Sequence, residues 1–134
     1  MKLAYPAIFI PFDDGNEGYT VEFPDLKGCV TEGSSMADAL FMAEDAASGW
    51  ILTMLEEGEN IPEASSLSTC EAPKDGFTSM VALDMDTYAE KYGSKAVKKT
   101  LTIPAWMNTY VEENDISCSR LLQDAISARL QAAH

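Results

Sequence analysis

Residues 18–33 read GYTVEFPDLKGCVTEG, and this stretch decides how the first part of the chain folds. Apolar and polar side chains alternate strictly over residues 19–23, which is the pattern of a strand with one buried face. Residues 24–28 contain a proline and a glycine that break this strand, and residues 29–33 are long enough for one more short strand. The stretch therefore predicts two neighbouring strands of a meander.

The residues before this stretch predict the first strand. Residues 3–12 alternate large apolar side chains and are rich in aromatic and β-branched types. Pro6 and Pro11 favour an edge position or the strand ends, because proline lacks the backbone donor that a central strand needs. Residues 13–18 supply the aspartate, asparagine and glycine that tight turns require. The strands on either side of this turn are therefore expected to form a β-hairpin.

One long helix is expected after the meander. Ser35, with Asp38 three residues later, resembles the capping box found at helix starts. Apolar side chains then recur every three or four residues up to Gly58, which indicates an amphipathic helix. Its small alanines would let the helix lie close against a sheet. The expected apolar face consists of Met36, Leu40, Ala43, Ala47, Trp50, Ile51 and Met54.

The remaining elements complete an α+β domain over residues 1–93. Residues 58–76 are polar and rich in serine, so we expect a loop, to which the sequence assigns no role. Residues 77–83 alternate again as a strand, and residues 86–92 predict a short helix that ends at Gly93. The expected order is β-β-β-α-β-α, with one sheet and one main helix.

Charge divides the chain into two parts. The 134 residues carry a net charge of −13 at pH 7, which argues against nucleic acid as a partner because affinity for DNA comes largely from neutralised phosphates. Residues 1–93 hold four lysines against 18 acidic side chains, whereas residues 94–134 hold five basic and four acidic ones. The first part is strongly acidic and the second slightly basic, which suggests two partners of opposite charge.

The sequence offers no set of residues for catalysis or for a cofactor. Cys29, Cys70 and Cys118 are odd in number and lack C-x-x-C spacing, and His134 is the only histidine. We expect these cysteines to pack as small apolar side chains. The carboxylates of residues 13–17 gather in one turn, whereas a two-metal nuclease needs carboxylates that converge from several strands. We therefore expect no enzyme activity, no metal and no cofactor.

We expect a folded cytoplasmic protein. Hydrophobic residues make up 46% of the chain and charged residues 23%, close to the average of globular domains. No apolar stretch approaches the roughly 20 residues that cross a bilayer, and the N-terminus lacks the cleavage pattern of a secretory signal. We expect no contact with a membrane.

Residues 94–134 predict a small module of one strand and two helices. Residues 98–103 alternate as a short strand, and Pro104 suits the first turn of a helix that runs to Asn114. Ser117 can cap a second helix. About 37 residues are too few to bury a core of their own. The strand must therefore join the sheet of the first domain or pair with a second copy of itself.

The second option has a known form. KKTLTIP at residues 98–104, followed by a helix and by SCSRLLQDAI at residues 117–126, resembles the ribbon-helix-helix family of DNA-binding proteins. The resemblance implies a β-α-α homodimer whose two antiparallel strands enter the major groove. With a period of two along the strand, Leu101 and Ile103 face the helices. Lys98, Thr100 and Thr102 then point outward.

These faces assign a role to each candidate residue. The outward side chains expected to read base edges are Lys98, Thr100 and Thr102. The groups expected to contact phosphates, some of them at the start of the second helix, are Lys95, Lys99, Ser117, Ser119 and Arg120. The expected dimer core consists of Leu101, Ile103, Leu121, Leu122 and Ile126.

The first part of the chain resembles HicB antitoxins. The matching residues are YPAI at 5–8, the stretch 18–33, Ala39-Leu40, Ala43-Glu44, Ala46, Gly58 and Ile61-Pro62. The resemblance implies a partial ribonuclease-H-like domain that binds and blocks HicA, a small basic ribonuclease toxin. It also implies that the tail represses the shared operon by binding operator DNA, as a dimer or a tetramer. An acidic domain suits a basic partner on electrostatic grounds as well.

Two other functions remain open from the sequence. The first is a ribbon-helix-helix repressor whose first domain senses a small ligand and which has no toxin partner. The second is a metal-dependent nuclease, which the distribution of carboxylates disfavours. A short basic reading frame beside the gene would favour the antitoxin, and its absence would favour the sensor.

Overall fold

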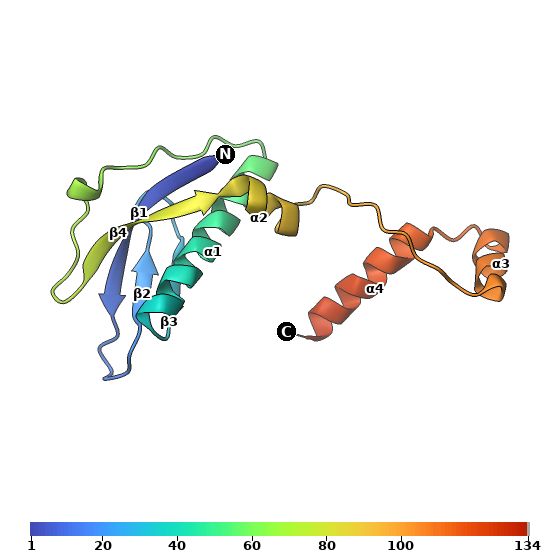
Figure 1. Ribbon diagram of the computed structural model, residues 1–134, viewed down its shortest axis with the longest axis horizontal. Helices are drawn as coiled ribbons and strands as arrows, with labels where there is room; N and C mark the ends of the chain where they lie inside the picture. Colours follow the sequence, from blue (N-terminus) through green and yellow to red (C-terminus); the bar gives the residue numbers. More distant parts are fainter. Residues whose placement is uncertain (134) are drawn as a thin grey trace. The chain divides into compact units, whose positions relative to one another are not determined.

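The computed structural model describes residues 1–133 and divides into two compact units, Met1–Lys95 and Ala96–His134, which are described separately (Figure 1). The first unit has the α+β fold that the sequence predicts, with a single four-stranded sheet. Its strands are β1 (Lys2–Pro11), β2 (Tyr19–Glu22), β3 (Val30–Gly33) and β4 (Phe77–Asp84), and its helices are α1 (Met36–Glu56) and α2 (Met85–Tyr92), with a short 3-10 helix η1 (Leu67–Thr69). The second unit contains α3 (Ala105–Glu113) and α4 (Cys118–Ala132).

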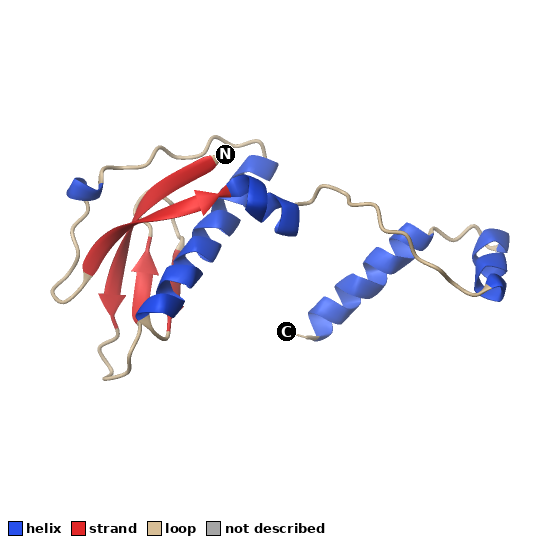
Figure 2. Ribbon diagram, viewed as in Figure 1, coloured by secondary structure: helices blue, strands red, loops and turns tan. Residues whose placement is uncertain are grey.

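The sheet is antiparallel throughout, in the order β3-β2-β1-β4 (Figure 2). β1 is a central strand with β2 on one side and β4 on the other, so an edge position for the strand with the two prolines is wrong. Pro6 is tolerated because β2 pairs only with residues 8–11 of β1, which leaves β1 with a single partner strand at Pro6. Pro11 is the last residue of the strand.

The core lies between one face of the sheet and α1, which crosses that face in Figure 1. Tyr5, Ala7 and Phe9 of β1 share this face because strand side chains alternate, and each is at most 2% exposed. Phe9 stacks on Phe77 of β4 with ring centroids 4.7 Å apart. The predicted alternation of β1 is thus confirmed, with its large side chains facing the helix.

The start of α1 follows the predicted cap. The Ser35 hydroxyl accepts a hydrogen bond from the Asp38 N–H (3.1 Å), and the Asp38 carboxylate accepts one from the Ser34 N–H (2.8 Å). The strand before it ends at Gly33, where a Cβ would collide with the Ala39 backbone. Glycine is therefore required for β3 to approach α1 so closely.

The buried face of α1 differs in part from the predicted one. The buried residues are Ala39, Ala43, Ala47, Ser48, Ile51 and Leu52. Met36 and Leu40, expected in the core, are each 42% exposed. Ser48 is buried on the side of α1 that faces α2, a neighbour whose position the spacing of apolar residues does not reveal.

The turn at residues 24–28 positions α1 and the long loop after it. Trp50 of α1 donates its indole N–H to the Lys27 carbonyl (3.2 Å). Asp25 accepts a hydrogen bond from the Ser65 N–H (2.9 Å), and the Tyr5 hydroxyl donates to the Pro62 carbonyl (2.6 Å). The loop expected at residues 58–76 is therefore held against the sheet domain by the same turn that decides the meander.

Over its described residues, 96–133, the second unit has two helices and no strand. Residues 96–104 have no strand partner within the described chain, so the strand expected at residues 98–103 is not formed in a single chain. A strand needs backbone partners, and none is available here. None of residues 96–133 is buried. Along residues 1–133, no helix is both long and apolar enough to span a bilayer.

Candidate functional site

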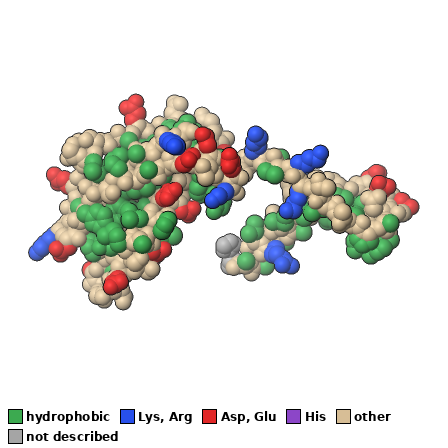
Figure 3. All heavy atoms as spheres, viewed as in Figure 1, with side chains coloured by type: hydrophobic (Ala, Val, Ile, Leu, Met, Phe, Trp, Pro, Cys, Tyr) green, Lys and Arg blue, Asp and Glu red, His purple; other side chains and the backbone are tan. Residues whose placement is uncertain are grey.

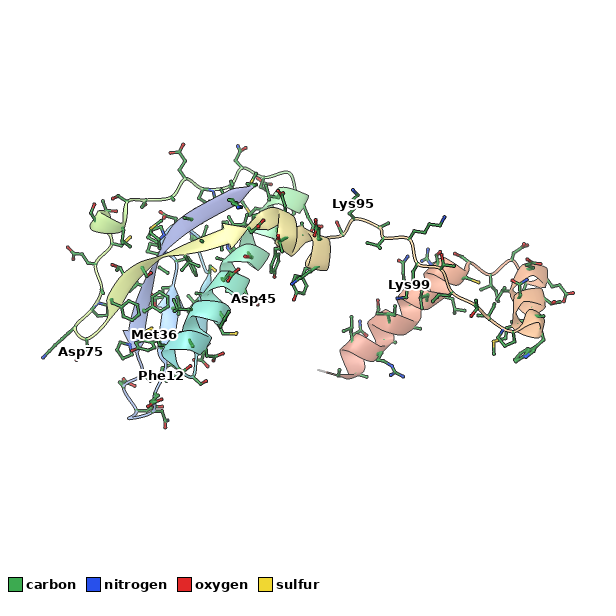
Figure 4. All side chains as sticks on the ribbon, in the orientation of Figure 1. Phe12, Met36, Asp45, Asp75, Lys95 and Lys99 are labelled. Atoms are coloured by element: carbon green, nitrogen blue, oxygen red, sulfur yellow. The ribbon has the colours of Figure 1, made fainter. Side chains whose placement is uncertain are left out.

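The residues predicted to read bases lie together on the extended segment before α3. Lys98, Thr100 and Thr102 are all exposed. Lys99, predicted to contact phosphate, lies on the same segment, and Lys95 is the last residue of the first unit (Figure 4). The chain therefore presents this segment to solvent with every predicted side chain accessible.

The other predicted phosphate contacts lie at the start of α4. Ser117 is the N-cap, and its hydroxyl accepts a hydrogen bond from the Arg120 N–H (3.3 Å). Ser119 is in the first turn of the helix. The first N–H groups of any α-helix lack acceptors within the helix, so this turn can donate to an anion while the Ser117 oxygen serves as the cap.

The predicted dimer-core residues are exposed in the single chain. Leu101 is 56% exposed and Leu121 is 55% exposed, with Ile103 and Ile126 close to half and Leu122 partly covered. Five further apolar side chains of this unit are exposed and were not assigned to the dimer core, namely Val97, Trp106, Met107, Tyr110 and Leu130. The four-residue spacing of Trp106 and Tyr110 on α3 was the signal available for two of them. Apolar surface on this scale marks a site of association.

The acidic side chains of the first unit are almost free of internal pairing. In the part of the chain that the structure describes, the single ion pair joins the Met1 ammonium group to Asp86 (2.7 Å). Asp and Glu side chains are scattered over the visible face of this unit in Figure 3. The fold therefore leaves nearly all of the 18 carboxylates of this unit without a cationic partner.

The turn between β1 and β2 uses one of its carboxylates in its own structure. Asp14 accepts hydrogen bonds from the backbone N–H and the side-chain amide of Asn16 (3.0 and 3.1 Å), which lower the pKa of the Asp14 carboxyl.

Residues 1–133 contain no group of three or more His, Cys, Asp or Glu side chains placed to hold a metal ion. Cys29 is buried, and burial raises the pKa of its thiol.

Comparisons with known proteins cover both units. A family model described as "HicB_like antitoxin of bacterial toxin-antitoxin system" matches residues 5–128. An uncharacterised 14.9 kDa protein from the rep-hol intergenic region of Haemophilus phage HP1 (strain HP1c1) is 32% identical over 93 residues, which cover 67% of each chain.

Solved structures are similar over almost the whole chain. A chain of a toxin–antitoxin complex from Streptococcus pneumoniae has a TM-score of 0.75 and 29% identity, covering 96% of this chain and 99% of that one. The antitoxin HicB of Burkholderia pseudomallei has a TM-score of 0.61 and 21% identity, covering 98% and 99% of the two chains. The second similarity is one of fold.

Proposed function

Because this chain belongs to the HicB-like antitoxin family of bacterial toxin–antitoxin systems, we propose that it binds and neutralises a HicA-type ribonuclease and represses its own operon. The observation that carries the proposal is the extent of the family match, which spans the acidic unit and the helical unit alike. The similar chain in the Streptococcus pneumoniae complex supports a protein partner.

Toxin binding is assigned to residues 1–93. A ribonuclease that cleaves mRNA needs a basic surface to attract phosphates. This domain has a net charge of −14 from its four lysines and 18 acidic side chains, and it pairs only one carboxylate internally. Opposite charges accelerate the encounter of two proteins, so an acidic domain is suited to reach the toxin before RNA does. We assign this domain no nuclease activity.

DNA binding and dimerisation are assigned to residues 94–134. A second copy supplies the missing strand partner, so that Leu101 and Ile103 are buried between two chains with Leu121, Leu122 and Ile126. Lys98, Thr100 and Thr102 then face base edges on the outer side of the ribbon. The phosphate contacts are Lys95, Lys99, Ser117, Ser119 and Arg120. Because operator DNA and mRNA are both found in the cytoplasm, we assign both activities to that compartment.

Co-expression tests the proposal. The full chain is produced together with each small basic protein encoded beside its gene, and complexes are purified from cells that survive. We expect one neighbour to co-purify and its ribonuclease activity to be blocked. The association rate constant should fall as salt rises, because salt screens the attraction between the oppositely charged proteins; the Debye length is about 8 Å at 0.15 M. The dissociation rate constant should change less.

Two outcomes would contradict this function. If no neighbour co-purifies and the chain still binds DNA, the ligand-sensing repressor is the better explanation. If the purified chain degrades RNA in the presence of magnesium, the chain has nuclease activity of its own and our assignment is wrong.

A further inference from the structure

A groove of about 200 Å³ lies between α1 and α2 of the first unit, and no motif in the sequence points to it. Asp45, on the side of α1 near α2, marks its position in Figure 4. The groove is lined from α1 by Phe41, Glu44 and Asp45 and from α2 by Tyr88 and Tyr92. It therefore brings aromatic rings and carboxylates together on one surface.

The aromatic residues are more exposed than the fold requires. Phe41 is 73% exposed and Tyr92 is 63% exposed, so neither contributes much to the core. Tyr92 packs on Tyr88 with ring centroids 4.7 Å apart and planes inclined by 41°. Large aromatic side chains exposed at a surface are enriched at protein interfaces, where they bury much area.

The carboxylates of the groove lack a cation. Glu44 and Asp45 form no ion pair within residues 1–133, and the groove is lined by one lysine, Lys91, against the carboxylates of Glu44, Asp45 and Asp84. The Tyr88 hydroxyl donates a long hydrogen bond to Asp45 (3.4 Å), which orients one oxygen of that carboxylate. The groove is therefore net negative, and Tyr88 contacts one of its carboxylates.

The backbone of α1 makes room for this arrangement. A Cβ at Gly49 would lie 3.2 Å from the Tyr88 hydroxyl oxygen, so glycine lets the tyrosine lie across the helix. Burial and the neighbouring Asp45 raise the pKa of Tyr88, which keeps its hydroxyl protonated as a donor. Ser48, 2% exposed, also lines the groove.

We propose that this groove receives an arginine side chain of the basic toxin, with the guanidinium stacked on the Tyr88–Tyr92 face and paired with Glu44 and Asp45. A guanidinium is planar and always charged, so it can lie on an aromatic ring and pair with a carboxylate at the same time. An uncharged partner would leave the carboxylates desolvated without a counter-ion. The inference rests on the proposed function and adds the docking surface and the chemistry of the docked residue.

The test measures the affinity of the full chain for the toxin recovered by co-expression. Phe41→Ala and Tyr92→Ala remove exposed rings, and each is expected to weaken binding about tenfold or more, as anchor residues do. Glu44→Gln should weaken binding and flatten its dependence on salt. Glu59→Gln makes the same change of charge at an exposed position outside the groove and should alter the Kd less than about twofold. Urea unfolding followed by Trp50 fluorescence in a Trp106→Phe background should match that of wild type for each variant, which shows that the first unit is folded.

Phenylglyoxal, which modifies arginine, tests the identity of the docked side chain. The wild-type chain should protect at least one toxin arginine from modification, and the Phe41→Ala and Tyr92→Ala chains should leave that arginine reactive. If the wild-type chain protects no toxin arginine from modification, the inference is overturned.

The outcomes separate this inference from the function it rests on. If wild type binds the toxin and both aromatic variants bind it equally well, the groove is not the docking surface and the antitoxin function stands. If the variants change the oligomeric state of the free chain without changing toxin binding, the groove is an interface between copies and the inference fails. If wild type binds no toxin, the proposed function fails first.

Discussion

The two units bury their apolar side chains in different ways. Residues 1–95 enclose a core in which Tyr5, Phe9 and Ile51 are almost completely shielded from solvent. None of residues 96–133 is buried, although this unit carries leucines, isoleucines and aromatic residues. A folded protein rarely leaves so much apolar surface in water. The first unit therefore encloses its own core, whereas we propose that a second copy of the chain covers the apolar surface of the second unit.

Leu101→Asp tests this difference between the units, and of all the variants we expect it to have the largest effect. If Leu101 is buried between two copies, an aspartate there places an unpaired charge in an apolar interface, which costs several kcal/mol. We expect the dimer formed by the second unit to dissociate and operator binding to be lost. Analytical ultracentrifugation and DNA titration of the full chain measure both effects.

Leu101→Val is the control for this variant because it keeps an apolar side chain and should keep the dimer. A Leu101→Asp chain that remains dimeric and binds DNA like wild type would show that the second unit is completed in another way.

The core of the first unit should respond to Ile51→Ala. Truncation of a fully buried isoleucine lowers the free energy of unfolding by about 2–5 kcal/mol through lost burial and the cavity left behind. Trp50 fluorescence in a Trp106→Phe background reports on this unit alone during urea unfolding. DNA binding below the denaturation range should be unchanged.

Leu40→Ala is the matched control on the same helix. Leu40 and Ile51 have the same place in the predicted apolar face, but Leu40 is 42% exposed and Ile51 is fully buried. The loss of stability for Leu40→Ala should therefore be less than half of that for Ile51→Ala. Equal losses would mean that the predicted face of α1 was right and the observed one wrong.

A smaller effect should separate the two faces of the ribbon. Lys98→Ala and Thr100→Ala each remove a side chain expected to bond a base edge, and each should reduce preference for the operator over random DNA by about 1–3 kcal/mol. Lys99→Ala should weaken binding to both DNAs alike, because an interaction with phosphate carries no sequence information. Equal weakening on operator and random DNA for all three variants would show that the assignment of faces is wrong.

The fold of the first unit was predictable because its sequence signals are local. Alternation defines the strands, and Ser35 with Asp38 defines the helix start. The order β3-β2-β1-β4 was not predictable, since pairing of β4 with β1 joins residues about 70 positions apart and leaves no periodic signal. The edge position predicted from the prolines was wrong for a related reason. Whether Pro6 has a second neighbouring strand depends on the length of β2, which the sequence around Pro6 does not report.

The candidate sites divide in a similar way. The residues of the second unit that we expect to bind DNA could be proposed from strand parity and family resemblance, and their roles stay predictions. The α1–α2 groove could not be found, because Phe41 and Tyr92 lie on different helices whose packing the sequence does not report. Asp25 is the opposite case. It lies within the stretch 18–33 that predicts the meander, and it also holds the loop after α1 by accepting a hydrogen bond from the Ser65 N–H.

The smallest expected effect concerns the cap of α2. The Asp84 carboxylate accepts a hydrogen bond from the Thr87 N–H (3.3 Å) at the start of this helix. This bond, with help from the charges of Lys2 and the N-terminus, holds the pKa of Asp84 below its ordinary value. A carboxyl whose pKa is lower in the folded state stabilises the fold above its unfolded pKa, and this contribution is lost as pH falls through the folded pKa.

Asp84→Asn tests this contribution, because asparagine caps helices about as well as aspartate but carries no charge. The difference in unfolding free energy between wild type and Asp84→Asn should therefore be small at pH 7 and should shrink further at an acidic pH below the lowered folded-state pKa of Asp84, where the wild-type carboxyl is protonated as well. Urea unfolding followed by Trp50 fluorescence in the Trp106→Phe background measures the difference at both pH values. Glu71→Gln removes one carboxylate from the loop, away from any helix start, and serves as the reference for a change of net charge alone. A difference that is the same at both pH values, or the same for Asp84→Asn and Glu71→Gln, would show that the charge on the cap contributes nothing specific to the first unit.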